Sequence, residues 1–142
     1  MAIPYTKTLS EIIASIEAQT TVEGQATVLR ENSSPALKAI LSAAMHPSAV
    51  WYLPEGAPPY KSAPPEQNSE QAHVFYSEAR KLIYFYNTPD GAALKPARRE
   101  YLFVQMLEMV SAEDAKLLLR VKDKALTIIP EAVALAFPKV LA

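Results

Sequence analysis

The chain has 142 residues, of which 50% are hydrophobic and 20% are charged, and its net charge is -1. This size and composition predict one folded domain over residues 1–142 and exclude general disorder. The near-zero charge gives no overall attraction to nucleic acid or anionic membranes, and the absence of cysteine excludes disulfides, thiol catalysis and thiolate metal sites.

Targeting and membrane signals are missing from the sequence. No apolar run approaches the roughly 18 residues that a membrane helix needs. The first residues lack the basic region and apolar core of a signal peptide. We therefore expect a soluble, intracellular protein.

The N-terminal segments predict three helices. Apolar residues at helical spacing indicate an amphipathic helix from about Thr8 to Gln19. Thr20, Thr21 and Gly24 interrupt the pattern, and a second helix is predicted over 25–31. Ser34 followed by Pro35 is typical of a helix start, because the hydroxyl caps the first turn and proline needs no partner there.

A proline-rich segment, residues 47–68, follows the third helix; we call it the arm. It holds six of the twelve prolines and the single tryptophan, Trp51. Long irregular segments in compact domains are typically disordered or used for binding. Because a stiff backbone loses little entropy on docking, aromatic residues between prolines favour binding. The predicted protein-binding residues are Trp51, Tyr52, Leu53, Pro54, Pro58, Pro59, Tyr60 and Lys61.

A second interpretation of the arm stays open at this point. Tyr84, Phe85 and Tyr86 are consecutive, so they cannot all face one core, and at least one of them points outward or lies under the arm. The arm aromatics, Trp51 among them, could fold back on these rings and pack against their own domain. The two interpretations are compatible with each other.

The C-terminal half predicts further helices. The longest is expected from Ser69 to Tyr86, ended by turn residues at 87–91. Others are expected from near Pro96, from a capping box at Ser111, and after Pro130. No strand of useful length is found apart from a possible isolated one over 125–129. The predicted fold is an all-α bundle of six or seven helices with the arm attached.

Candidates for chemistry are few. His46 and His73 have no carboxylate at ligand spacing, so no metal site is predicted. Glu113 and Asp114 are adjacent, but they fall in the first turn of a helix, where negative charge is favoured. No glycine-rich phosphate loop and no nucleophile motif is present. We therefore expect no enzyme activity, no catalytic residue and no cofactor.

A local cluster of positively charged side chains indicates an alternative function. These residues could form a phosphate-binding patch that serves a nucleic-acid accessory role. Nearby glutamates at 78, 100 and 108 can neutralise the patch, which makes nucleic acid an unlikely partner. The residues of this weaker alternative are Arg80, Lys95, Arg98 and Arg99.

Several short motifs occur in an ordered series along the chain. They are Ser34-Pro35-Ala36-Leu37, the stretch Leu53-Pro54-Glu55-Gly56-Ala57-Pro58-Pro59-Tyr60-Lys61, residues 78–82, 99–103 and 115–124, and Ala136-Phe137-Pro138. The series resembles a family of small uncharacterised proteins of large contractile-tailed phages (myoviruses, including cyanophages). The resemblance covers residues 30–140, and the proline-rich stretch is its most specific part. It implies a phage origin and supplies no catalytic residues.

These observations lead to three hypotheses. The first is a non-enzymatic protein-interaction component of a phage, associated with the head, neck or tail of the virion and docking through the arm. The second is an infection-stage regulator that binds a host or phage protein, and the third is the nucleic-acid accessory protein. The expected location is the host cytoplasm during infection, and the virion on the first hypothesis. Replacing Trp51 and Tyr60 together by alanine is expected to abolish partner capture and to leave helicity intact.

Overall fold

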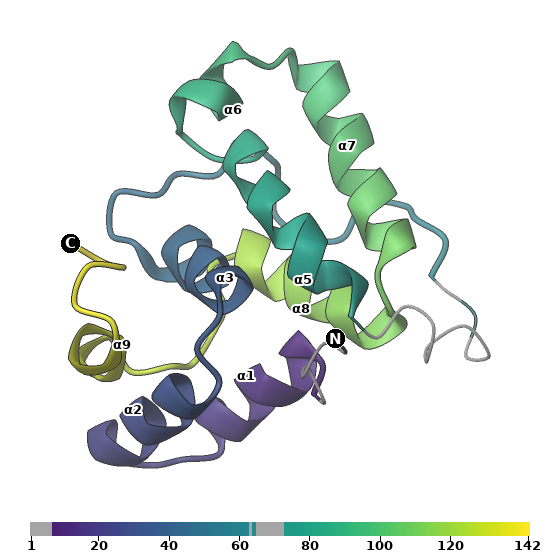
Figure 1. Ribbon diagram of the computed structural model, residues 1–142. Helices are drawn as coiled ribbons and strands as arrows, with labels where there is room; N and C mark the ends of the chain where they lie inside the picture. Colours follow the sequence, from purple (N-terminus) through teal and green to yellow (C-terminus); the bar gives the residue numbers. More distant parts are fainter. Residues whose placement is uncertain (1–6, 63, 65–72) are drawn as a thin grey trace, which may run out of the picture.

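The computed structural model describes residues 7–62, 64 and 73–142, and its regular elements are helical (Figure 1). The all-α prediction is therefore confirmed. Within the described ranges there are eight α-helices and one 3₁₀ helix, where six or seven helices were expected. The bounds are α1 Leu9–Glu17, α2 Val22–Glu31, α3 Pro35–Met45, α5 Val74–Glu78, η2 Ala79–Tyr84 (3₁₀), α6 Pro89–Ala93, α7 Pro96–Met109, α8 Ala112–Lys122 and α9 Pro130–Ala136.

Side-chain caps set the starts of the first three helices. Thr8 and Glu11 form a reciprocal capping box at α1. α2 begins at Val22, earlier than predicted, because the Thr21 hydroxyl accepts a hydrogen bond from the Gly24 amide at 2.9 Å. Thr20 and Thr21 do lie between the two helices, as predicted, whereas Gly24 lies inside α2 and interrupts nothing. The predicted start of α3 is confirmed, with Ser34 as its cap.

The long helix predicted up to Tyr86 is instead divided, and its expected start at Ser69 lies outside the described residues. α5 ends at Glu78, and the chain continues as the 3₁₀ helix η2. A 3₁₀ helix has three residues per turn. Ala79, Leu82 and Phe85 are consequently all buried on one side. Side chains three residues apart eclipse one another in a 3₁₀ helix, so the same side of η2 faces the core at each turn.

The turn predicted at 87–91 ends the preceding helix, and its last three residues begin the short helix α6. Thr88 caps α6 by accepting from the Gly91 amide at 2.9 Å. A Cβ atom on Gly91 would lie 2.1 Å from the Tyr86 carbonyl oxygen, so only glycine fits here without a backbone shift. This close approach lets α6 reverse the chain between η2 and α7 (Figure 1).

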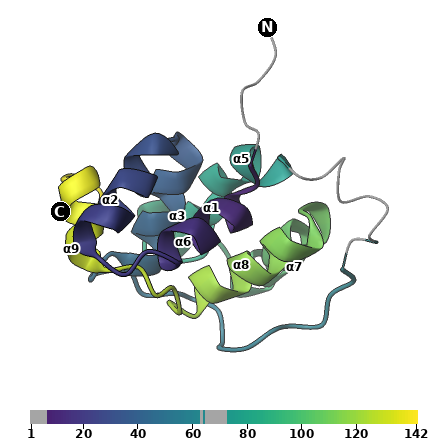
Figure 2. The same cartoon turned by 90° about the horizontal axis from the view of Figure 1, so that it is seen from below.

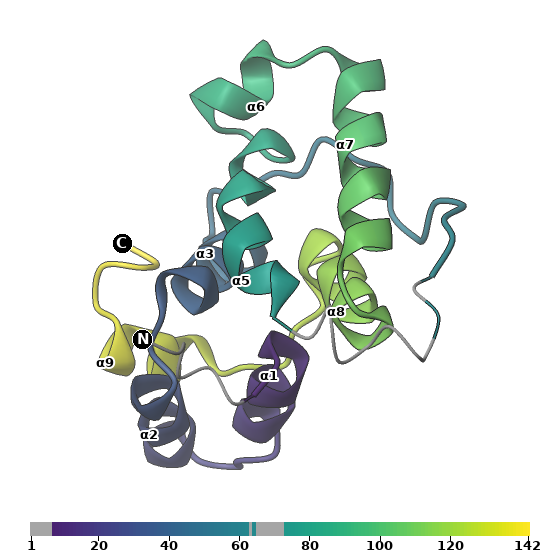
Figure 3. The ribbon, with the colours of Figure 1, turned by 45° about the vertical axis from the view of Figure 1, so that its right-hand side comes forward.

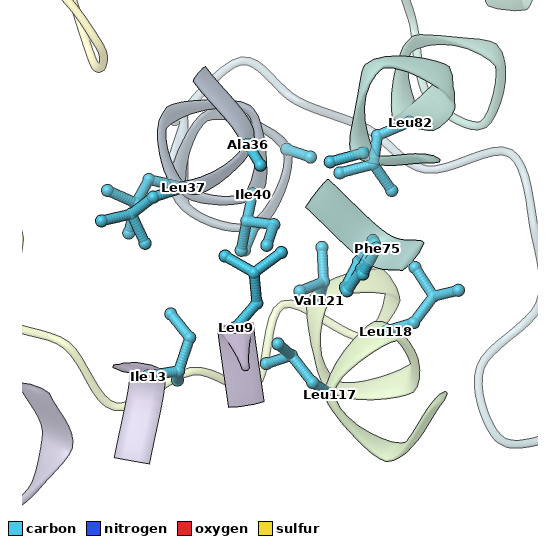
Figure 4. Close-up of a cluster of buried hydrophobic side chains, with 14 of the residues drawn as sticks. Leu9, Ile13, Ala36, Leu37, Ile40, Phe75, Leu82, Leu117, Leu118 and Val121 are labelled. Carbon is cyan, nitrogen blue, oxygen red and sulfur yellow. The ribbon is translucent and has the colours of Figure 1, made fainter. Parts of the chain in front are cut away.

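α8 lies at the centre of the helical arrangement, as its sequence predicted. It contacts α1, α3 and α7, and it begins where Ser111 caps the amide of Asp114. Segment 125–129 forms no strand. Figure 4 shows α8 side chains Leu117, Leu118 and Val121 meeting residues of α1, α3 and α5 in the core. Across the described ranges, no helix is long and apolar enough to cross a membrane.

A buried carboxylate joins the first turns of α1 and α8. Asp114 Oδ1 accepts a hydrogen bond from the Ser10 amide at 3.0 Å, and the Asp114 side chain is fully buried. Burial raises the pKa of this carboxyl, although the hydrogen bonds from Ser10 and Ser111 oppose the shift. The bond from α1 gives Asp114 a structural role beyond the helix-end effect that its position predicted.

A second carboxylate ties α1 to the other end of α8. Glu17 receives two hydrogen bonds from the Arg120 guanidinium, at 3.0 and 2.5 Å, and two from the amide and hydroxyl of Thr127, both at 2.8 Å. Burial alone would raise the pKa of Glu17. The four hydrogen bonds and the charge of Arg120 outweigh burial, so the pKa lies below its ordinary value.

This arrangement predicts an acid-sensitive contribution to stability. Because folding lowers the pKa of Glu17, its contribution is present above the ordinary value of 4.5 and is lost as the pH falls through the folded-state pKa. We expect Glu17→Gln to cost about 2 kcal/mol at pH 7. The difference from wild type should shrink below pH 4.5 in urea titrations followed by circular dichroism.

The informative quantity is the difference in unfolding free energy between wild type and Glu17→Gln, because folding shifts the pKa of Asp114 in the direction opposite to that of Glu17. The raised pKa of Asp114 makes the fold relatively more stable as the pH falls towards 3.8, and this effect is common to both proteins. Glu113→Gln is the matched control. Its pair with Lys116 is exposed and its helix-end effect is small, so a change below about 0.5 kcal/mol is expected. A constant Glu17→Gln difference from pH 7 to pH 3 would show that the ionised carboxylate is unimportant.

Candidate functional site

The arm is attached to α3 through its tryptophan. The carbonyl of Ala43 in α3 would normally accept from the amide four residues later, but that residue is Pro47, which has no N–H. The indole Nε1 of Trp51 donates to this carbonyl at 2.9 Å. The proline that ends α3 thus creates a free acceptor, and the arm's own tryptophan satisfies it.

The ring of Trp51 packs on the segment that follows η2. It stacks on Phe85 with centroids 6.3 Å apart and planes 13° apart, and it lies 5.6 Å from the Tyr86 ring. An isolated antiparallel bridge joins Trp51 to Tyr86, and the Tyr52 amide donates to the Phe85 carbonyl at 2.9 Å. The structure thus follows the second interpretation of the arm at Trp51, which folds back on the domain.

Lys122, the last residue of α8, and Lys124, just after it, bind carbonyls of the arm and of the residue before it. The ammonium of Lys124 donates to the carbonyls of His46 and Ala49, at 3.1 and 2.9 Å. The ammonium of Lys122 is buried, donates to the Pro54 carbonyl at 2.7 Å, and also contacts the carboxylate of Asp123. Figure 2 shows the arm running along the edge of the molecule beside α8 and α7.

Arg99 connects the segment that precedes α7 to the arm. Arg99 is only 7% exposed and donates to the carbonyls of Gly91 and Leu94, both at 2.7 Å. Its guanidinium lies 4.8 Å from the centre of the Tyr52 ring. Arg99 therefore uses its charge inside the domain.

This placement corrects the predicted phosphate-binding patch. Arg99 is buried and cannot contact a nucleic-acid backbone. Arg80 is exposed on η2 and donates to the Ser77 carbonyl, while Lys95 and Arg98 are exposed at the start of α7. The predicted cluster therefore keeps three exposed cations, one of them on a different element.

A pocket of about 310 Å³ opens between the arm and α7; we call it the arm pocket. Leu53, Phe103 and Val104 give its apolar walls, and the exposed side chains of Glu55 and Glu100 stand at its rim. The buried Lys122 also lines the arm pocket. The complete lining is Leu53, Pro54, Glu55, Gly56, Ala57, Pro58, Pro59, Glu100, Phe103, Val104 and Lys122.

Half of the predicted binding residues line the arm pocket: Leu53, Pro54, Pro58 and Pro59. Trp51 and Tyr60 are partly buried and pack against the core, whereas Tyr52 and Lys61 are exposed outside the arm pocket. Arm residues 63 and 65–68 lie outside the described residues. Sequence reasoning missed the α7 side of the pocket, because Phe103 followed the apolar stripe of a helix and was assigned to the core.

The histidines and acidic residues show no metal-binding arrangement in the described ranges: no group of three or more His, Asp or Glu side chains converges there. The Nδ1 atom of His46 accepts from the Ser48 amide at 3.0 Å, and its Nε2 atom lies 3.0 Å from the Ala142 carbonyl oxygen. These contacts hold the start of the arm against the C-terminal segment.

Comparison with known proteins gives a family and no role. No curated protein and no solved structure shows a match to the chain. One family model matches residues 12–128. The match extends from α1 to the segment before α9 and therefore includes the whole arm and α7. The chain belongs to the family DUF6433, which is described as a family of unknown function.

Proposed function

We propose that the chain is a non-enzymatic protein-interaction component that captures its partner in the arm pocket. The arm pocket itself carries this proposal. Contacts of Trp51, Lys122 and Lys124 hold the arm against the domain before any partner arrives. A binding surface that is already ordered loses little entropy on docking.

The lining indicates the chemistry of the partner. The volume of the arm pocket is at the lower end of the range for ligand pockets, about 300–1,000 Å³. It therefore suits one anchoring side chain of the partner. The walls are apolar, so the anchor is aliphatic or aromatic. The rim carboxylates of Glu55 and Glu100 are exposed, while Lys122 is already bonded to Pro54 and Asp123. We expect a basic residue beside the anchor in the partner.

The biological setting rests on the resemblance to proteins of contractile-tailed phages. Of the hypotheses it raised, we favour a component of the head, neck or tail of a virion. Quantitative mass spectrometry of purified particles tests this setting. A fixed ratio to the portal or tail proteins supports it, whereas absence from particles with abundance in infected cells would indicate an infection-stage regulator.

A photo-crosslinking amino acid at Ala57 tests the docking site. Ala57 is exposed and lines the arm pocket. We expect crosslinks from position 57 to one protein at a constant ratio, in infected cells or particles. Because the rim charges select the partner, adding Glu55→Lys and Glu100→Lys should reduce the yield about tenfold.

A matched charge reversal serves as the control for this experiment. Glu31 is exposed at the end of α2, and Glu31→Lys should leave the yield unchanged. Equal losses with the rim variants and with Glu31→Lys would show a general charge effect. Crosslinks from a position on α1, such as Ala14, in place of position 57 would move the docking site away from the arm pocket.

A further inference from the structure

A second hollow lies on the other side of α7. It opens between η2 and α7 and has a volume of about 340 Å³; we call it the η2 groove. Figure 3 shows η2, which follows α5, and α7 as two separate segments joined at one end through α6. The lining of the η2 groove includes Glu78, Lys81, Phe85, Arg98, Leu102 and Met109.

The α7 wall of the η2 groove is a continuous helical stripe. Arg98, Leu102, Met106 and Met109 follow one another at intervals of four, four and three residues. With a rise of about 1.5 Å per residue, this stripe extends for about 16 Å, or about three helical turns. The groove is therefore long enough for a short helix.

The floor of the η2 groove is apolar and adaptable. Phe85 and Met106 are buried beneath it, and Met109 at one end is 43% exposed. Unbranched methionine side chains adjust to different shapes, and they are common on surfaces that bind amphipathic helices. An exposed methionine at the end of an apolar groove is well suited to contact a partner.

The charges that face the η2 groove are positive in sum. Glu78 and Lys81 form an ion pair at 3.0 Å and neutralise each other. Arg98 stacks on the Tyr101 ring, with 5.5 Å between its guanidinium carbon and the ring centre, and forms no ion pair within the described ranges. Lys95, at the start of α7, adds an exposed cation nearby. The rim of the arm pocket has the opposite charge.

We propose that the η2 groove binds an amphipathic helix of a second protein partner. The helix is about three turns long, presents apolar residues at i, i+3 or i+4, and i+7, and places an acidic residue against Arg98. With the arm pocket on its other side, α7 would then contact two partners of opposite charge. The two proposals rest on different contacts, so either can fail alone.

Nucleic acid fits the η2 groove less well than a helix does. Arg98 and Lys95 could contact phosphates, but the floor of the groove, formed by the buried Phe85 and Met106, is apolar. Phosphate contacts come from cations arrayed along a backbone, whereas an apolar floor favours apolar side chains. Nucleic-acid binding is therefore an alternative outcome of the test.

Methionine methyl groups provide a specific readout. The chain has four methionines; Met106 and Met109 line the η2 groove, and Met45 ends α3 outside it. The probe is a synthetic amphipathic peptide of about 14 residues, with leucines on one face and glutamate beside them. We expect its addition to the full chain, labelled with ¹³C at the methionine methyls, to shift the Met106 and Met109 resonances and to leave Met45 unchanged.

Reversing the charge of the peptide, and then that of Arg98, tests whether the two charges attract each other. The same peptide with lysine in place of glutamate should bind about tenfold more weakly. Because Arg98 is exposed, Arg98→Glu should fold normally and reverse the preference between the two peptides. Glu55→Lys with Glu100→Lys, at the arm pocket, should change neither affinity.

Several results would overturn the proposal. One is equal binding of both peptides, and another is no methyl shift at millimolar peptide. A shift confined to the indole N–H of Trp51, the single tryptophan, in the proton spectrum of the same sample would place the peptide in the arm region. Stronger methyl shifts with a 12-nucleotide single strand, steeply reduced by salt, would indicate nucleic acid. Shifts of Met109 that follow protein concentration without peptide would identify a second copy of the chain as the occupant.

Discussion

Replacing Trp51 by alanine should lower the free energy of unfolding by about 3 kcal/mol and the melting temperature by about 10 °C. The substitution removes the stacked contact with Phe85 and the contact with Tyr86. It also leaves the Ala43 carbonyl without its indole donor. Trp51 is partly exposed, so we place the loss at the low end of values for buried aromatic residues.

Trp51→Phe separates the two causes. It keeps a ring beside Phe85 but removes the hydrogen bond to Ala43, so a smaller cost of about 1 kcal/mol is expected. Circular dichroism is the appropriate probe, because the variants lack the only tryptophan. The control is Tyr101→Ala, since Tyr101 is 54% exposed and a change below about 0.5 kcal/mol is expected.

This result would change the interpretation of the arm aromatics. From the sequence, replacing Trp51 and Tyr60 together was expected to abolish capture with helicity intact. With Trp51 packed on the domain, a loss of capture in that variant could follow from a loosened arm. Docking is better tested through exposed residues such as Glu55 and Ala57. If Trp51→Ala melts like wild type, Trp51 does not stabilise the domain, and the double variant tests partner capture directly.

Replacing Arg99 by leucine should cost about 3 kcal/mol, because it removes two charge-assisted hydrogen bonds at a buried site. The carbonyl of Leu94 would lose its guanidinium donor, and the cation that stacks on Tyr52 would be absent. α6, the start of α7 and the arm should all loosen together. Urea unfolding, followed by circular dichroism and by Trp51 fluorescence, measures the loss.

The neighbouring arginine is a matched control for Arg99. Arg98→Leu removes the same charge from an exposed position on the same helix, and a change below about 0.5 kcal/mol is expected. Arg99→Lys should recover only part of the stability, because an ammonium cannot reproduce the planar fork of the guanidinium. Equal effects of Arg98→Leu and Arg99→Leu would contradict the structural role of Arg99.

The sequence by itself determined the helical class and most of the helix starts. Ser34 before Pro35, Ser111 and the prolines at 96 and 130 act within the first turn of a helix, so neighbouring residues are enough to locate these boundaries. The central position of α8 followed from its broad apolar surface. Phage origin and the virion setting rest on the resemblance and stay predictions.

Only the tertiary structure decided how the candidate site is built. Lys122 reaches Pro54, and Trp51 reaches Phe85, across long stretches of sequence. Arg98 and Arg99 are adjacent arginines that the sequence does not distinguish. In the structure Arg98 is exposed, whereas Arg99 is buried beside the carbonyls of Gly91 and Leu94. Caps and turns depend on neighbouring residues, whereas pockets and buried charges depend on contacts that form only when distant segments pack together.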